Sequence, residues 1–312
     1  MACGTPQDDG DDDSGSSDDA STGDVGTGDT GTGDTTTDTT TADTQGTEDG
    51  TDTGTDTGEP ENPLLSDQFL VIAHRGGGRL RPEATLVAFE HALEVGADII
   101  EMDLHATADG VIVVIHDATV DRTTDGTGAV NDMSFDELRM LDAGYDFSPD
   151  GGQTFPYRGM GLVIPTMEEV LEAFPDAYYL MEIKQYDPPI VDEVIGILAE
   201  HQVGDRIVLA SFDDPTIEAV RAADPAVFTA MSAAEMAEFV GALDDPGYRP
   251  PCLFLQSPWD ITSQAVVDRA HELGMKVHPW TVNESALMTD LIGRGVDGIM
   301  TDDPELLVEV AG

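Results

Sequence analysis

Side chains able to do chemistry follow apolar runs of strand length at several places in this 312-residue sequence. Such runs, alternating with amphipathic stretches, are typical of parallel strands joined by helices. When parallel strands close into a barrel, their carboxyl ends meet at one face, where active sites lie. We therefore expect one site to collect His74 and Arg75 after run 69–73, Glu101 and Asp103 within run 98–104, His116 after run 111–115, Glu182 and Lys184 at the end of run 178–183, and Trp280 at the end of run 276–280.

Three of these residues are carboxylates suited to a metal ion. Glu101 and Asp103 are two positions apart, so on a strand they face the same way. Neighbouring carboxylates repel each other unless a cation neutralises them, and hard divalent ions prefer oxygen ligands. With Glu182 as a third ligand, the pattern predicts a site for Mg²⁺ or Ca²⁺. The alternative is that one carboxylate is a surface residue paired with an arginine.

His74 and His116 are candidates for a general acid and a general base, because imidazoles titrate near neutrality. Arg75 and Lys184 would supply positive charge for a phosphoryl group. Alternatively, the two cations form salt bridges to the carboxylates, and both roles are compatible. We expect the remaining histidines to be structural, with His105 beyond the strand end and His278 a weak further candidate: His91, His105, His201, His271 and His278.

The apolar runs predict a (β/α)₈ TIM-type barrel over residues 63–312. Nine strands are expected, at 69–73, 98–104, 111–115, 178–183, 207–210, 227–230, 253–256, 276–280 and 297–300. Run 111–115 follows its predecessor after only a turn, so we expect those two to pair locally. Asp98 and Asp297 fall at strand beginnings, where structural capping is expected.

Helix-boundary signals agree with these strand positions. Thr166 and Glu169 form a capping box for a helix ending near residue 174, while Asp214 and Asp303 each precede a proline as N-caps. Gly274 and Gly295 mark expected helix ends. Residues 117–165 are too long for an ordinary loop, so an inserted subdomain with one helical piece at 135–141 is expected.

Residues 1–62 consist mainly of Asp, Thr, Gly and Ser, and they predict a disordered acidic tether. The net charge of the chain is −50, and −32 remains after the 18 acidic residues of the tether are removed. This excess argues against nucleic acids and anionic membrane surfaces as partners. A bound cation together with Arg75 and Lys184 would still create a local positive site for an anionic ester.

The motifs, taken in order, resemble those of the glycerophosphodiester phosphodiesterase family over residues 70–304. The matching residues are His74-Arg75-Gly76 with Pro82-Glu83, Glu101-x-Asp103 with Thr107-x-Asp109-Gly110, His116-Asp117, Glu182-Ile183-Lys184, Trp280-Thr281-Val282-Asn283, and Gly295-Val296-Asp297-Gly298 with Thr301-Asp302. One such triplet carries little information, but six in sequence are a specific signal.

The resemblance implies a TIM barrel, a bound Mg²⁺ or Ca²⁺, and hydrolysis of a small-molecule phosphodiester to an alcohol and a phosphomonoester such as glycerol phosphate. It implies Glu101, Asp103 and Glu182 as metal ligands, His74 and His116 as the acid/base pair, Arg75 and Lys184 as phosphate ligands, and Trp280 as a wall of the substrate pocket. A neighbouring substrate hydroxyl would attack phosphorus before water resolves the cyclic product. Glu83 would support Arg75 or a metal ligand.

One residue departs from the family pattern, since Ala84 stands where the family has Asn after Pro-Glu. The lost amide would affect substrate positioning near the mouth of the site. Two other functions stay open. A lysophospholipase D or phosphoinositide-type enzyme would carry an apolar rim, for which Phe147, Phe155, Tyr157 and Met160 are candidates. Alternatively, these four residues form the small core of the insertion. A catalytically silent, ligand-binding lipoprotein is disfavoured by the two histidines and three carboxylates.

The two cysteines do not form a disulfide framework. Cys252 lies in an apolar run and is expected to be a small buried residue. Cys3, followed by the acidic tether, resembles the lipid-bearing cysteine of a secreted lipoprotein whose signal peptide has been removed. We therefore expect a secreted or cell-envelope location, with a lipid anchor at Cys3 as the one membrane contact.

Overall fold

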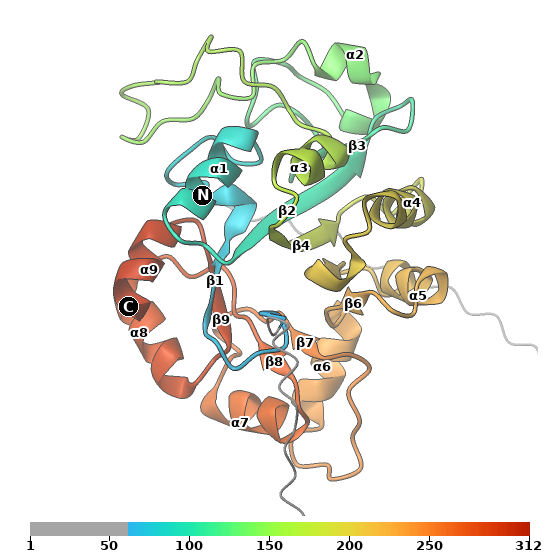
Figure 1. The fold of residues 1–312 in the computed structure, drawn as a ribbon, viewed down its shortest axis with the longest axis vertical. Coiled ribbons are helices and arrows are strands. Elements are labelled where there is room, and N and C mark those ends of the chain that lie inside the picture. The colour runs from blue at the N-terminus through green and yellow to red at the C-terminus, as the bar shows by residue number, and fades with distance from the viewer. Residues whose placement is uncertain (1–61) are drawn as a thin grey trace, which may run out of the picture. The chain divides into compact units, whose positions relative to one another are not determined.

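Eight parallel strands form a closed barrel in the computed structural model, which describes residues 62–312 (Figure 1). Six strands pair in the order β6-β5-β4-β2-β1-β9, and β7 pairs with β8. Two backbone hydrogen bonds close the ring: Met231 N donates to Phe254 O (3.0 Å), and Asp297 N donates to Val277 O (3.0 Å). The strands are β1 (Leu70–Ala73), β2 (Ile99–Ala106), β3 (Ile112–Val114), β4 (Tyr178–Ile183), β5 (Ile207–Ala210), β6 (Phe228–Thr229), β7 (Phe254–Leu255), β8 (Lys276–Val277) and β9 (Gly298–Thr301).

Helices surround the strands and begin at side-chain caps (Figure 1). Thr166 and Glu169 form the predicted capping box, and Asp303 caps the last helix as predicted. The expected cap at Asp214 is wrong: Asp213 accepts from Thr216 N, and Asp214 is already helical. The helices are α1 (Leu86–Glu94), α2 (Phe135–Leu138), α3 (Met167–Ala173), α4 (Val191–His201), α5 (Asp214–Ala223), α6 (Ala233–Gly241), α7 (Gln264–Glu272), α8 (Ser285–Arg294) and α9 (Pro304–Ala311).

The predicted barrel is confirmed, and so is the local pairing of β3 with β2, which is antiparallel. Several strand limits differ from those expected. β6, β7 and β8 have two residues each, because beyond these residues they pair with neighbouring strands only through isolated bridges and single hydrogen bonds. β2 continues to Ala106, so His105 lies within the strand and not beyond its end. Its Nε2 atom is 3.2 Å from the His116 carbonyl oxygen, which gives it a structural contact.

Alternation along the strands decides which side chains enter the barrel. Leu70 and Ile72 of β1 point into the interior, whereas Val71 packs outward against the helices. In β2, Ile99 is interior and Ile100 belongs to the outer layer. With this period of two, Glu101 and Asp103 project inward from the same strand. Burying an aliphatic side chain contributes about 1.5–3 kcal/mol, so the apolar positions hold the two carboxylates in this register.

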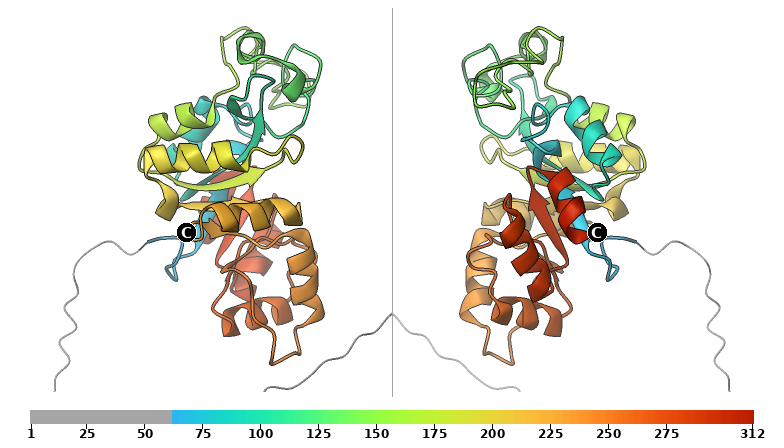
Figure 2. Two further views of the ribbon diagram at one scale, coloured as in Figure 1. Left: turned by 90° about the vertical axis from the view of Figure 1, so that its right-hand side faces the viewer. Right: turned by 90° about the vertical axis from the view of Figure 1, so that its left-hand side faces the viewer.

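The segment between β3 and α3 is an insertion with its own small core. It includes α2 and a short 3₁₀ turn, η2 (Val130–Asp132). Buried side chains of this segment and of β3 pack together in one cluster: Val113, Ile115, Val120, Val130, Leu138, Ala143 and Ile164. The expected helical piece at 135–141 is shorter, since α2 ends at Leu138. Figures 1 and 2 place this insertion on the α1–α3 side of the barrel, away from α6 and α7.

Two expectations concern residues outside the described part of the chain. The acidic tether, up to residue 61, and Cys3 lie there, so the tether and the lipid anchor stay predictions. Within residues 62–312, no helix has the length and apolar character needed to cross a membrane. Cys252, which lies two residues before β7, is half-buried rather than fully buried.

Candidate active site

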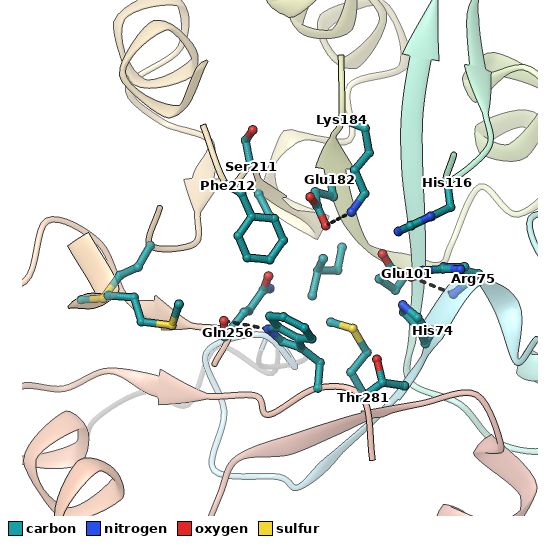
Figure 3. A pocket seen from close by; sticks show the side chains of 16 residues that line it. His74, Arg75, Glu101, His116, Glu182, Lys184, Ser211, Phe212, Gln256 and Thr281 are labelled. Carbon is teal, nitrogen blue, oxygen red and sulfur yellow. Dashed lines mark hydrogen bonds and ion pairs between the residues drawn. The ribbon is translucent and has the colours of Figure 1, made fainter. Parts of the chain in front are cut away.

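One pocket at the carboxyl ends of the strands gathers seven of the eight predicted site residues (Figure 3). Asp103 is the exception: it lies just behind the lining and contacts two residues that form it. The predicted residues that line the pocket are His74, Arg75, Glu101, His116, Glu182, Lys184 and Trp280. The sequence expectation that strand ends converge on one site is thus matched by the geometry.

The carboxylates of β2 are almost completely buried at the polar side of this pocket. Glu101 is 2% exposed and Asp103 is 1% exposed. The backbone N–H of Arg75 donates to Glu101 Oε2 over 2.7 Å, from a residue in the left-handed region (φ 52°). Burial, together with the neighbouring Asp103 charge, raises the pKa of Glu101 to about 8. A carboxyl group in such a position favours a nearby cation.

Two cationic side chains lie against these carboxylates. Lys184 Nζ is 2.8 Å from Glu182 Oε2 and 3.4 Å from Asp103 Oδ1. Arg75 Nε is 3.5 Å from Asp103 Oδ2. The salt bridges that the sequence offered as an alternative for Arg75 and Lys184 are therefore present. Both cations also line the pocket, so a phosphoryl group entering it would meet them.

The donor set suits a hard divalent cation, although no preformed cage is seen. Within residues 62–312, no group of three or more His, Cys, Asp or Glu is close enough to hold a metal ion. However, the buried atoms Asp103 Oδ2 and Glu182 Oε1 have no hydrogen-bond partner. Buried carboxylate oxygens are normally paired, and hard divalent ions bind such oxygens. The residues thus fit the predicted ion, and the metal site stays a prediction.

His74 is held by a carboxylate at the end of β9. Its Nδ1 atom lies 2.6 Å from Asp302 Oδ1. An ionised carboxylate only accepts hydrogen bonds, so Nδ1 carries the proton and Nε2 is left for the pocket. Asn283 Nδ2 donates to the other oxygen of Asp302 over 2.7 Å. Although burial opposes it, the Glu101 charge and the Asp302 hydrogen bond raise the pKa of His74.

His116 is held in the same way by its sequence neighbour. Its Nδ1 atom lies 2.6 Å from Asp117 Oδ1, so its Nε2 is also free of that bond. Burial lowers the pKa of His116 despite the opposing effects of Asp103 and Asp117. The environments of the two imidazoles therefore push their pKa values apart, which is how enzymes assign an acid and a base.

The opposite side of the pocket is apolar. The rings of Phe212 and Trp280 meet edge to face, with centroids 5.6 Å apart, and Met231 and Met236 complete this side. Trp280 Nε1 donates to the carbonyl oxygen of Gln256 over 2.9 Å. The buried Nε2 of Gln256 lines the pocket without a hydrogen-bond partner, which leaves a donor for a ligand.

Other predicted roles are structural. Asp98 Oδ2 and Asp297 Oδ2 each accept a strand N–H over 2.8 Å, as expected. Glu83 supports Arg75, whose Nη1 donates to it over 3.1 Å. Ala84 does not line the pocket but is buried beside it, where its N–H donates to the Arg75 carbonyl oxygen over 2.9 Å, so the effect of the missing amide stays a prediction. His278 is fully buried, and its pKa is lowered to about 4, mainly by burial.

The insertion does not provide the apolar rim that its aromatics suggested. Phe147 and Tyr157 pack edge to face, with centroids 5.5 Å apart, and the guanidinium of Arg158 covers the Phe155 ring at 3.8 Å. None of these aromatics lines the catalytic pocket. They instead stabilise the insertion, which was the other possibility for them.

Sequence reasoning gave no role to Asp302, Asn283, Phe212 or Gln256. A signal existed for the first two, since both lie in the quoted late motifs and Asp302 follows β9. Phe212 and Gln256 follow β5 and β7 as isolated residues without a motif. Their position in the barrel, rather than their spacing in the sequence, brings them into the pocket.

Known proteins of one family are similar to this chain in sequence and in fold. The sequence profile of the Glycerophosphoryl diester phosphodiesterase family matches residues 74–306. The chain belongs to this family. A "Glycerophosphodiester phosphodiesterase" of Caldanaerobacter subterraneus subsp. tengcongensis is 36% identical over 261 residues, which cover 77% of this chain and 97% of that protein. The sequence resemblance is therefore confirmed.

Solved structures show the same fold. A family domain from Mycobacterium tuberculosis superposes with a TM-score of 0.70 at 23% identity, covering 78% of this chain and 98% of that one, and it supports the fold alone. A phosphodiesterase of Oleispira antarctica, solved with the product sn-glycerol-3-phosphate, has a TM-score of 0.66 at 26% identity and covers 78% of this chain and 96% of that one. Enzymes of this family generally use a divalent metal.

Proposed function

We propose that the chain hydrolyses glycerophosphodiesters to an alcohol and glycerol phosphate, with His74 and His116 as the acid/base pair. The observation that carries this proposal is the pair of imidazoles lining one pocket, each fixed at Nδ1 by a carboxylate. The similar protein of Caldanaerobacter bears the name of this activity, and the similar Oleispira structure contains its phosphate product.

The opposite pKa shifts of the two imidazoles support opposite roles for them. His116, whose pKa is lowered, is neutral near pH 7 and takes the proton of the attacking hydroxyl at Nε2. His74, whose pKa is raised, keeps its proton to a higher pH than His116 and gives its Nε2 proton to the leaving alcohol oxygen. A P–O bond to the attacking substrate hydroxyl forms, and the P–O bond to the leaving alcohol breaks. The two imidazoles exchange roles when water opens the resulting cyclic phosphodiester.

The polar wall stabilises the charge that develops on phosphorus. Arg75 and Lys184 lie where they can donate to phosphoryl oxygens, and positioned charge of this kind contributes strongly in a site that excludes water. Glu101, Asp103 and Glu182 would hold Mg²⁺ or Ca²⁺. When bound, such an ion supplies positive charge to the phosphoryl oxygens and acidifies a bound hydroxyl.

Gln256 gives the pocket a means of recognising a polar group. Its unpaired Nε2 donor lies on the apolar side, away from the histidines. A substrate hydroxyl that accepts this hydrogen bond would be favoured over an analogue that lacks it, because an unmet buried donor is costly. The glycerol moiety carries such hydroxyls.

A lysophospholipid is the second candidate substrate. Phe212 is 42% exposed at the lip of the pocket, and Trp259 (45%) and Ile261 (36%) are exposed on the loop after β7. The amide of Trp259 donates to Trp280 O over 3.1 Å, which joins this loop to the apolar wall. An acyl chain leaving the pocket on this side would find apolar contacts.

A panel of glycerophosphodiesters and lysophospholipids, assayed with Mg²⁺ and with Ca²⁺, tests the proposal. We expect release of glycerol phosphate from the former class. The proposed function would be rejected if the folded protein, supplied with either ion, released glycerol phosphate from none of these substrates. Preferential cleavage of lysophospholipids would favour the second candidate.

We also propose that the chain acts outside the cytoplasm, tethered by a lipid on Cys3. Support comes from the sequence alone: Cys3 is followed by an acidic spacer in which Val25 is the one branched aliphatic residue and which has no aromatic residue. Membrane association that is lost on Cys3→Ser replacement in the producing cell would agree with this. Unchanged fractionation of that variant would refute it.

A further inference from the structure

Arg122 lies at the start of the insertion and uses all three guanidinium nitrogens. Its Nε donates to Asp117 Oδ2 over 2.6 Å. Nη1 and Nη2 donate to the two carboxylate oxygens of Glu83, each over 2.7 Å. The side chain is 46% exposed and does not line the catalytic pocket. Arg122 thus joins the loop after β3 to the loop after β1.

Each carboxylate that Arg122 holds also contacts a residue of the catalytic pocket. Asp117 Oδ1 is 2.6 Å from His116 Nδ1, and Glu83 Oε1 accepts from Arg75 Nη1 over 3.1 Å. Arg122 is therefore the centre of a continuous chain that runs from His116 through Asp117 and Glu83 to Arg75. Its two ends are the proposed base and a proposed phosphate ligand.

The charges along this chain are strongly coupled. Although burial opposes it, hydrogen bonds from Arg122 and His116 lower the pKa of Asp117 to about 2. Burial also opposes the shift of Glu83, whose pKa is lowered by Arg122 and Arg75. An isolated exposed ion pair contributes little, but a bidentate guanidinium within a network fixes geometry.

We propose that Arg122 is a positioning residue of the active site, and that the insertion serves to deliver it between Asp117 and Glu83. This inference rests on the proposed roles of His116 and Arg75. Arg122 holds Asp117 in the orientation in which its Oδ1 accepts from His116 Nδ1, so that His116 presents Nε2 to the substrate. It also fixes Glu83, which holds the guanidinium of Arg75 beside Asp103.

Arg139 provides a matched control within the insertion. Its Nη1 donates to Glu169 Oε2 over 2.6 Å and to the Ile164 carbonyl, at a side-chain exposure of 31%. This ion pair joins α2 to the capping box of α3 and contacts no residue of the catalytic pocket. Its loss would lower the stability of the insertion and leave the hydrogen bonds of Arg122 to Asp117 and Glu83 intact.

The test compares R122Q, R122K and R139Q in the full chain with the same glycerophosphodiester. We expect kcat to fall by about 100-fold in R122Q, since a small misplacement of reacting groups has effects of that size. R122K keeps the charge but not the fork, so its kcat should lie between R122Q and wild type. R139Q should lower the melting temperature and leave kcat unchanged.

NMR titration of the His116 ring gives a readout that does not depend on turnover. Besides Asp117, the groups that act on the titration of His116 are Asp103, Arg75 and Lys184. Without Arg122, the Asp117 carboxylate is free to stabilise the imidazolium, so the pKa of His116 should rise in R122Q. R139Q should not move it. R122Q should also cost little more activity in an H116A background.

A folded R122Q or R122K enzyme with wild-type kcat and an unmoved His116 pKa would overturn the inference. Failure of the wild type to cleave any glycerophosphodiester is a different result. It would reject the proposed function, while the NMR titration of the variants would still decide whether Arg122 positions His116.

Discussion

The two sides of the pocket are built differently. On the side of β1, β2 and β4, charged groups are buried and tied together: Asp103 is 1% exposed and is paired with Arg75 and Lys184. On the side of β5 to β8, Phe212 and Trp280 meet by ring packing, and Phe212 is 42% exposed. Groups proposed for chemistry are thus fixed by ionic networks, whereas those proposed for substrate choice are held by looser apolar contacts.

Removal of divalent ions should lower activity more than any substitution on the polar side of the pocket. We expect chelation by EDTA to lower kcat by at least about 1,000-fold, because a bound ion supplies several kcal/mol of charge stabilisation. Mg²⁺ or Ca²⁺ should restore the rate in a coupled assay of glycerol phosphate release. Full activity in protein shown to be metal-free would mean that Glu101, Asp103 and Glu182 have another role.

Substitution of either proposed acid/base residue should have the next largest effect. We expect His74→Ala and His116→Ala each to lower kcat by about 100- to 10,000-fold, the usual range for acid–base catalysis. His271→Ala is a matched control, since His271 forms a similar pair with Asp297 (2.8 Å) away from the pocket. Steady-state kinetics with circular dichroism decides this. Wild-type turnover in either variant removes that residue from the mechanism.

A smaller effect is expected on the apolar side. Phe212→Ala should raise KM for an acylated substrate by about 10-fold, because full burial of a Phe side chain contributes about 1.5–3 kcal/mol and this one is only partly buried. Its effect on glycerophosphodiesters without an acyl chain should be weaker, and kcat should change little for both. Met140→Ala, at a residue 83% exposed in the insertion, is the control. Equal effects on both substrates would contradict an acyl-binding role.

The barrel and most of the polar side were predictable from the sequence. β4 and β5 have the predicted limits, because each is a continuous apolar run between turns. The carboxylates and histidines were predictable because strand ends of a parallel barrel converge. The short strands β6 to β8 were not, since their limits depend on pairing with neighbours rather than on hydrophobicity.

Contacts between distant loops were also beyond sequence reasoning. Arg122 meets Glu83 across 39 positions, whereas its contact with Asp117 spans only five. Phe212 reaches Trp280 because β5 and β8 lie in the same barrel. Neither pair has a local spacing rule, so only the closed structure brings them together.

The pH dependence of kcat/KM for wild-type protein shows whether His74 and His116 act as acid and base. His116 must be neutral, and its pKa is lowered from 6.5, so activity should be lost as pH falls through a value below 6.5. His74 must be protonated, and its pKa is raised from 6.5, so activity should be lost as pH rises through a value above 6.5. A bell-shaped profile bracketing 6.5 is predicted, and a profile with only one limb, or none, would contradict the assignment of the two imidazoles.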